Sequence, residues 1–190
     1  MQTHTFIAAV LVVAQLVAFS SAGCAAESPR LVGEVIKVVD GDTLDVRLDS
    51  GPIRVRLHAA DTPERAQPYG KDASAALAQL VLHKIVEIEP FEQDRYERLV
   101  GIVYLQNKNI NAELIRAGHA WAFRRYMRKA DAELCALEAA ARQAHRGLWK
   151  LKTAERIAPW EYRSRKSRHS FTDYANETAS QCIAAIGKRY

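Results

Sequence analysis

The sequence lacks the residue patterns of several common enzyme classes. It has no Gly-x-Ser-x-Gly elbow, no His-Glu-x-x-His motif, no P-loop and no Cys-x-x-Cys pair. These absences count against α/β-type serine hydrolases, zinc proteases, P-loop proteins and thioredoxin-like enzymes. Only three cysteines occur in 190 residues, without the spacing of a metal site. Any catalytic chemistry must therefore come from other side chains.

Charged residues are absent from positions 1–23, where an apolar run from Phe6 to Phe19 is broken only by Gln15. The run is shorter than the roughly 20 residues that span a bilayer, and small residues follow it. This pattern predicts an export signal over 1–23. Because the first five residues contain no Lys or Arg, an uncleaved anchor is the alternative.

Two processing sites fit the junction after this run. Ser20-Ser21-Ala22 suits an ordinary signal peptidase, whereas Ser21-Ala22-Gly23-Cys24 resembles a bacterial lipobox with Ser where Leu is usual. We expect an exported protein, secreted or periplasmic, with a lipid anchor at Cys24 as the alternative. In an oxidising compartment Cys135 and Cys182 either pair or remain one buried and one exposed thiol, and the sequence favours neither.

The composition is that of one globular domain, with 48% apolar and 26% charged residues. Lys and Arg number 27 against 22 Asp and Glu, which gives a formal net charge of +5. A basic balance favours an anionic partner such as nucleic acid or a membrane surface.

Hydrophobic periodicity predicts five strands and three helices. Residues of Thr43–Leu48 alternate between apolar and charged, and a strand beginning at Ile53 puts Arg54 and Arg56 on the face opposite its aliphatic residues. The other expected strands are Leu31–Val39, Lys84–Phe91 and Leu99–Leu105. The expected helices are Tyr69–Leu82, Asn109–Arg116 and Asp131–His145, with Gly118 and Gly147 following the last two. Together they predict an α+β fold built on a small barrel.

The chain changes character after Trp149. The stretch Lys152–Arg168 holds six basic and two acidic residues, so it either follows a phosphate backbone or is a solvated tail. We therefore divide the chain into a signal (1–23), a folded domain (30–150) and a basic C-terminal extension (151–190).

Carboxylates and arginines gather in two short segments. Asp40-Gly41-Asp42-Thr43 forms a turn between strands, and Arg56 to Glu64 contains Asp61-Thr62-Pro63. Paired Asp residues at tight turns supply hard oxygen ligands of the kind that bind Ca²⁺ or Mg²⁺. An ordinary Asx turn is the alternative for Asp40-Gly41-Asp42.

Taken with the Asp94–Arg98 stretch, these segments resemble the staphylococcal nuclease (thermonuclease) family. The resemblance covers roughly Leu31 to Trp149 and includes Tyr69-Gly70 and Arg146-Gly147-Leu148-Trp149. It implies an OB-fold, a five-stranded β-barrel with three helices, which agrees with the periodicity. It also implies an enzyme that cleaves DNA and RNA and leaves 3′-phosphate ends. We expect the protein to be a monomer.

The resemblance assigns roles to individual residues. Asp42, Asp61 and the Thr62 carbonyl would hold Ca²⁺. Asp40 would contact these ligands without binding the ion itself. Glu64 would act as the general base or orient the attacking water. Arg56 and Arg98 would grip the scissile phosphate, which gains charge in the transition state. Substrate contacts are expected from Tyr126, Arg124, Lys71 and Tyr96.

The sequence departs from the family pattern next to the second arginine. Glu97 stands where Gly is usual, so a turn that needs positive φ would be strained, and the extra carboxylate could pair with Arg98. Arg124 replaces a tyrosine, which exchanges stacking for a cation contact. The rival interpretation is a non-catalytic nucleic-acid-binding OB-fold module of the cell envelope.

Overall fold

The computed structural model describes residues 29–164 and 171–188. The expected export signal and the alternative lipid anchor at Cys24 lie outside these residues. Within the described part of the chain, no helix is both long and apolar enough to cross a membrane.

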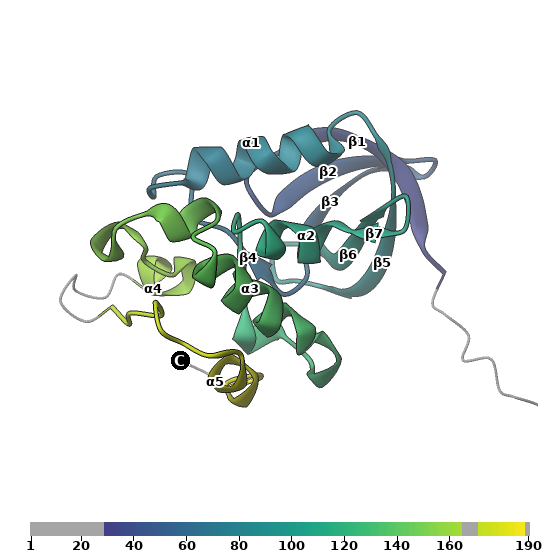
Figure 1. Ribbon diagram of the computed structural model, residues 1–190. Helices are drawn as coiled ribbons and strands as arrows, with labels where there is room; N and C mark the ends of the chain where they lie inside the picture. The colour runs from purple at the N-terminus through teal and green to yellow at the C-terminus, as the bar shows by residue number, and fades with distance from the viewer. Residues whose placement is uncertain (1–28, 165–170, 189–190) are drawn as a thin grey trace, which may run out of the picture.

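Five strands form a closed mixed barrel (Figure 1). They are β1 (Leu31–Val38), β2 (Thr43–Leu48), β3 (Gly51–Leu57), β5 (Ile85–Gln93) and β6 (Leu99–Leu105). Neighbours pair antiparallel in the order β3-β2-β1-β5-β6, and the parallel pairing of β3 with β6 closes the barrel. The predicted α+β OB-fold with a five-stranded barrel is therefore confirmed.

Three longer helices accompany the barrel, each within a few residues of the predicted bounds. They are α1 (Gly70–Val81), α2 (Ile110–Arg116) and α3 (Glu133–Gln143). The short strands are β4 (Ala60–Asp61), β7 (Lys108–Asn109) and β8 (Trp121–Ala122). The 3₁₀ turns are η1 (Arg124–Tyr126), η2 (Lys129–Asp131), η3 (Gly147–Lys150) and η4 (Thr153–Glu155), and the last helices are α4 (Pro159–Arg163) and α5 (Ala179–Ala184).

The main core fills the barrel and continues under the helices. Inward residues of the strands, such as Leu44 and Val55, are fully buried against apolar residues of all three longer helices, including Leu77, Leu114 and Leu134. Each strand and helix buries one face in this core, which explains the apolar periodicity of the sequence.

Two glycines allow the α2 and α3 ends to meet. Gly118 and Gly147 both have positive φ, at 76° and 53°. A Cβ on Gly118 would lie 2.3 Å from the Arg146 carbonyl oxygen, and one on Gly147 would lie 2.2 Å from the Gly118 carbonyl oxygen. Only glycine fits both positions, so the two chain segments are held in backbone contact.

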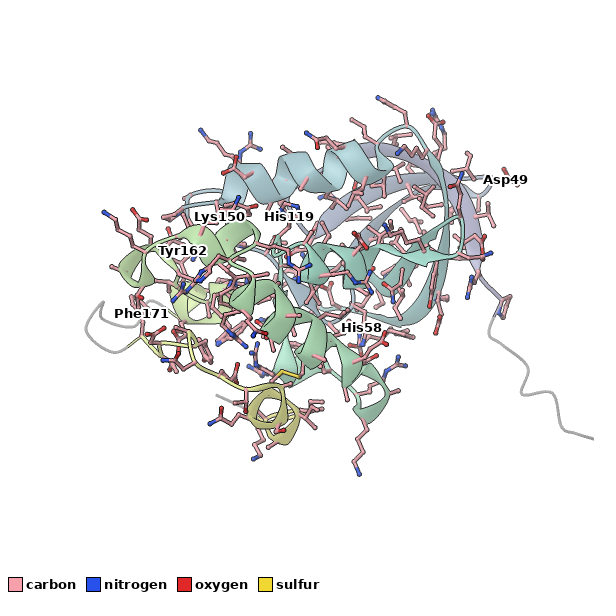
Figure 2. The ribbon with its side chains drawn as sticks, in the orientation of Figure 1. Asp49, His58, His119, Lys150, Tyr162 and Phe171 are labelled. Carbon is pink, nitrogen blue, oxygen red and sulfur yellow. A yellow bond between two sulfur atoms is a disulfide. The ribbon has the colours of Figure 1, made fainter. Side chains whose placement is uncertain are left out.

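The described part of the C-terminal extension packs on the domain rather than leaving it. Trp160 of α4 stacks on Phe123, and its ring meets Trp121 and Tyr174 edge-on. A disulfide between Cys135 and Cys182 joins α3 to α5, shown as the yellow bond in Figure 2. Figure 1 shows α3, α4 and α5 gathered on one side of the molecule, away from the barrel's β1–β2 edge.

Candidate active site

The candidate site is built around Arg56, near the end of β3. Val55 and Leu57 point into the core, so the strand alternation turns Arg56 outward. One guanidinium nitrogen lies 3.0 Å from an Asp42 oxygen, and another lies 2.7 Å from an Asp61 oxygen. Arg56 also donates to the Ala60 carbonyl at 2.7 Å. A single side chain therefore fixes both predicted metal-ligating carboxylates.

The second oxygen of Asp42 is held by the loop that follows β4. The Thr62 amide and hydroxyl donate to it at 2.8 and 2.9 Å. The loops approach closely because Gly41 has no side chain: a Cβ there would lie 2.5 Å from the Thr62 hydroxyl oxygen. The sequence Asp-Gly-Asp is therefore more than an isolated Asx turn, since its glycine admits the partner loop.

Asp61 is the most enclosed carboxylate of the site, with none of its side chain exposed to solvent. It lies in β4, whose pairing with β8 places it opposite Trp121. Burial raises the pKa of the Asp61 carboxyl, while the charges of Arg56 and Arg163 oppose that rise. A buried carboxylate of this kind is stable only beside cations, and the structure supplies two of them.

Glu64 follows the same loop and is partly exposed. Its amide donates to the Gln67 side chain at 2.8 Å, which fixes the backbone at this position. Its carboxylate accepts from Arg163 at 2.8 Å. Glu64 and Asp61 therefore accept hydrogen bonds from the same guanidinium.

Asp40 contacts the backbone of Asp42 within the turn between β1 and β2. One of its oxygens accepts from the Asp42 amide at 3.1 Å. Burial and the neighbouring charge of Asp42 raise the pKa of Asp40 to about 6.

Arg98 lies on the same outer surface of the barrel as Arg56. Parallel pairing sets Val100 opposite Arg56, and Arg98, two residues earlier on the chain, shares the face of Val100. Arg98 forms an ion pair with Asp94 at 2.7 Å. Burial raises the pKa of Asp94, but hydrogen bonds from Arg98 and the turn outweigh it and lower that pKa overall.

The turn before Arg98 shows the strain expected of Glu97. Its φ is 61°, in the left-handed region that favours glycine. The Glu97 side chain is exposed, and the ion pair of Arg98 is made with Asp94 instead. Glu97 therefore adopts a disfavoured backbone conformation, and the expected ion pair between Glu97 and Arg98 is not formed.

Three of the four expected substrate-contacting residues are exposed. Tyr96 and Tyr126 are 65% and 49% exposed, and Arg125 lies over the Tyr126 ring. Lys71 lines an open groove of about 500 Å³ between α1 and β1, together with Lys37 and Arg65.

The fourth, Arg124, requires a correction. Its side chain is completely buried, and it pairs with Glu138 of α3 and with Glu177 of the extension. It also donates to the Ala122 carbonyl at 2.6 Å. Sequence reasoning placed it at the substrate because it occupies a tyrosine position, but the buried Glu138 and the partly buried Glu177 hold it inside the protein.

The donor chemistry of the site fits Ca²⁺. Asp42 and Asp61 are buried carboxylates close enough that the charge of Asp42 raises the pKa of Asp61. Hard oxygen donors of this kind are what Ca²⁺ prefers, and two carboxylates with a main-chain carbonyl leave positions for water and substrate. The described residues contain no group of three or more acidic, His or Cys side chains arranged for a metal, so the fit rests on these two carboxylates and the Thr62 carbonyl.

Sequence reasoning missed Arg163, which contributes to the site from the far end of the chain. It donates to both Asp61 oxygens, at 3.1 and 2.8 Å, and to Glu64. Its only signal was the basic character of Lys152–Arg168, which does not indicate which cation turns inward.

The chain matches known proteins over the same region. The family model described as "Staphylococcal nuclease homologue" matches residues 54–151. The chain is 40% identical to Protein ParB of Escherichia coli, over 70% of this chain and 80% of the relative. It is 39% identical to a Micrococcal nuclease of Shigella flexneri, over 69% and 79%. With the barrel and the Asp42–Arg56–Asp61 arrangement, these matches show that the chain belongs to the staphylococcal nuclease family, as a homologue of micrococcal nuclease.

Proposed function

We propose that the protein is an exported, calcium-dependent nuclease that hydrolyses phosphodiester bonds of DNA and RNA and leaves 3′-phosphate ends. The observation that carries this proposal is that Asp42 and Asp61 both pair with Arg56, while Glu64 shares the Arg163 guanidinium with Asp61. Asp42 comes from the turn between β1 and β2, the other carboxylates come from the stretch after β3, and the fold brings the two segments to one point on the barrel. Relatives named as nucleases support the same activity.

The residues divide the work in a way that suits an anionic substrate. Asp42, Asp61 and the Thr62 carbonyl would hold Ca²⁺, which supplies positive charge at the phosphate and polarises a water molecule. Glu64, partly exposed beside Asp61, would orient that water or accept its proton. Arg56 and Arg98 would donate to phosphate oxygens, and these contacts strengthen as negative charge builds in the transition state.

The substrate would lie across the exposed side of this centre. Tyr126 and Tyr96 present exposed rings, and base stacking on such rings tolerates any sequence. Lys71 and Arg65 line the adjoining groove, where they would contact phosphates of a bound strand. Both kinds of contact favour a single-stranded or locally opened substrate with little base specificity.

The Cys135–Cys182 disulfide supports export. Disulfides persist in oxidising compartments and are uncommon in the reducing cytosol. The bond thus agrees with the signal expected over 1–23, and we propose secretion or a periplasmic location.

The test is cleavage of single-stranded DNA and RNA by the purified protein, with Ca²⁺ and then with a chelator. We expect cleavage that the chelator abolishes. Asp42→Ala should weaken Ca²⁺ binding, because it removes a charged ligand. Arg98→Ala should keep Ca²⁺ affinity near normal and lower turnover by roughly a hundredfold, since one lost charge contact in the transition state costs about 3 kcal/mol.

Arg95→Ala is the matched control, because Arg95 is an exposed arginine of the same turn. It should retain nearly full turnover. Arg56→Ala is a less selective variant, since Arg56 also holds both carboxylates in place. A folded wild-type protein that binds DNA but leaves DNA and RNA uncut at all Ca²⁺ concentrations would replace the enzyme with a binding module.

A further inference from the structure

We propose that Arg163 is a further residue of the active site, a built-in cation that holds Asp61 and Glu64 in the metal-free protein and competes with Ca²⁺ for them. The proposal deepens the function proposed above and rests on it. It concerns a residue of the C-terminal extension, beyond the region 54–151 that matches the family model.

The contact between Arg163 and Asp61 is a forked, two-point ion pair rather than a single surface contact. Both terminal nitrogens of Arg163 donate to Asp61, and one of them also reaches Glu64 at 2.8 Å. Such a forked arrangement engages both Asp61 oxygens at once. Burial lowers the pKa of Arg163, but the charges of Asp61 and Glu64 outweigh it, so its pKa is raised and the guanidinium remains charged.

Packing of the extension places Arg163 at the site. Trp160, three residues earlier on α4, stacks on Phe123 with ring centres 5.3 Å apart and planes 7° from parallel. Ala158, at the start of the helix, has no exposed surface. The helix is therefore fixed at its beginning, and its last residue is directed to Asp61.

A second link joins the extension to the loop that carries Glu64. The Gln67 side chain accepts from the Glu64 amide at 2.8 Å and donates to the Ile157 carbonyl at 3.0 Å. One buried amide thus holds the Glu64 backbone and the segment before α4 together. The position of Arg163 relative to Glu64 is set by the backbone as well as by the ion pair.

Arg163 and a metal ion would bind the same carboxylate oxygens, so they are alternative partners of Asp61. The three carboxylates of Asp42, Asp61 and Glu64 face the two guanidiniums of Arg56 and Arg163. A divalent ion bound by Asp61 needs a carboxylate oxygen that Arg163 now occupies. Because the Arg163 side chain is 41% exposed, it can turn to solvent without opening the core.

The competition predicts two opposite effects of Arg163→Met. Calorimetric titration should show Ca²⁺ binding at least about tenfold tighter than in the wild type, because a positive charge beside a metal ligand is gone. In chelator, the variant should melt at a lower temperature, since Asp61 stays buried with one cation fewer. Added Ca²⁺ should then raise its melting temperature by more than it raises that of the wild type.

Two further variants separate the effect of the forked Arg163 guanidinium from the effect of positive charge in the extension. Arg163→Lys keeps the charge but loses the fork, so its Ca²⁺ affinity should fall between those of the wild type and Arg163→Met. Lys152→Met removes one charge from the same extension at an exposed position and should match the wild type in both measurements. In the wild type, the side-chain NMR signal of Arg163 should change when Ca²⁺ saturates the site, a readout that needs no variant to fold.

The outcomes distinguish this inference from the proposed function. If the wild type cuts DNA with Ca²⁺ while Arg163→Met binds Ca²⁺ with unchanged affinity, or if Ca²⁺ leaves the Arg163 signal unmoved, the competition is overturned and the nuclease stands. If the wild type and Arg163→Met both fail to bind Ca²⁺, the calcium-dependent function falls and the competition falls with it.

Discussion

At the scale of single residues, position 97 shows how one side chain strains a turn. The backbone there has positive φ, and the Glu97 amide donates to the Asp94 carbonyl at 3.0 Å to close the turn. A residue with a Cβ is disfavoured in this conformation, whereas glycine adopts it freely. The site retains the turn despite the cost, since the turn positions Arg98.

Glu97→Gly should therefore stabilise the protein by about 1 kcal/mol, measured by urea denaturation. Because Arg98 pairs with Asp94 rather than with Glu97, the substitution should leave nuclease turnover at least as high as in the wild type. Glu92→Gly, at an exposed position within β5, is the matched control and should destabilise the protein. A lower denaturation midpoint for Glu97→Gly would contradict the strain interpretation.

The site residues that sequence reasoning identified share one property. Asp42, Asp61 and Glu64 stand in short turns or next to them, in segments where the family resemblance could assign them roles without knowledge of the fold. Arg124 and Arg163 were misjudged or missed because their roles depend on distant partners. Nothing near Arg124 in the sequence indicates that Glu138 and Glu177 will enclose it, and nothing near Arg163 points to Asp61.

At the scale of elements, a buried pair joins the turn η2 to the end of β3. His58 Nε2 lies 2.9 Å from an Asp131 oxygen, and Arg128 donates to Asp131 from its backbone at 2.7 Å. Figure 2 shows His58 at the edge of the barrel beside the α3 region. Burial raises the pKa of Asp131, but the hydrogen bonds from His58 and Arg128 outweigh it and lower that pKa well below its ordinary value of 3.8.

This pair predicts a pH-dependent loss of stability. A carboxyl with a lowered folded-state pKa contributes stability that is complete above its unfolded value of 3.8 and is lost as the pH falls through the folded value. Asp131→Asn should lower the free energy of unfolding by about 2 kcal/mol near neutral pH. The difference from the wild type should narrow below about pH 3.8.

Asp49→Asn is the control for this prediction, since Asp49 lies exposed in the turn between β2 and β3 (Figure 2). Its unfolding free energy should follow that of the wild type across the same pH range. A constant difference between Asp131→Asn and the wild type from pH 7 to pH 2 would show that the charge of Asp131 is not the stabilising feature.

Elements were more predictable than the contacts between them. The strands Thr43–Leu48 and Leu99–Leu105 agree with expectation at both ends. The first alternates between apolar and polar residues and the second is a short apolar run, and both patterns are local properties of the sequence. The short strands β4 and β8 carry no such pattern, since two residues cannot show a period. Their pairing, which places Asp61 opposite Trp121, becomes visible only in three dimensions.

At the scale of the whole molecule, the extension behaves as part of the fold. Its Trp160 and Tyr174 share one apolar cluster with Trp121 and Trp149 of the nuclease-like region. Its Glu177 accepts from the buried Arg124, and Cys182 is bonded to Cys135. The basic stretch of the extension suggested a choice between phosphate contact and a solvated tail, and its role in packing was not indicated because its apolar residues follow no clear period.

The disulfide should therefore stabilise the entire chain. It closes a loop of 47 residues between α3 and α5, and loop-closure entropy of that length corresponds to roughly 4 kcal/mol. In urea containing a reductant, the wild type should unfold at a lower concentration, close to that of the Cys135→Ser/Cys182→Ser double variant, which the reductant should not affect.

Unfolding should also occur in one step, because the three tryptophans connect the small β4–β8 sheet, the turn after α3 and the extension. Trp121, Trp149 and Trp160 lie in one cluster, so their fluorescence should change together with the circular dichroism of the barrel and helices. An extension that detaches first would move the fluorescence change of Trp160 to lower urea, which a Trp160→Phe variant would reveal by removing that early step. Such a separate transition would mean that the extension, with Arg163, leaves the site independently of the nuclease-like domain.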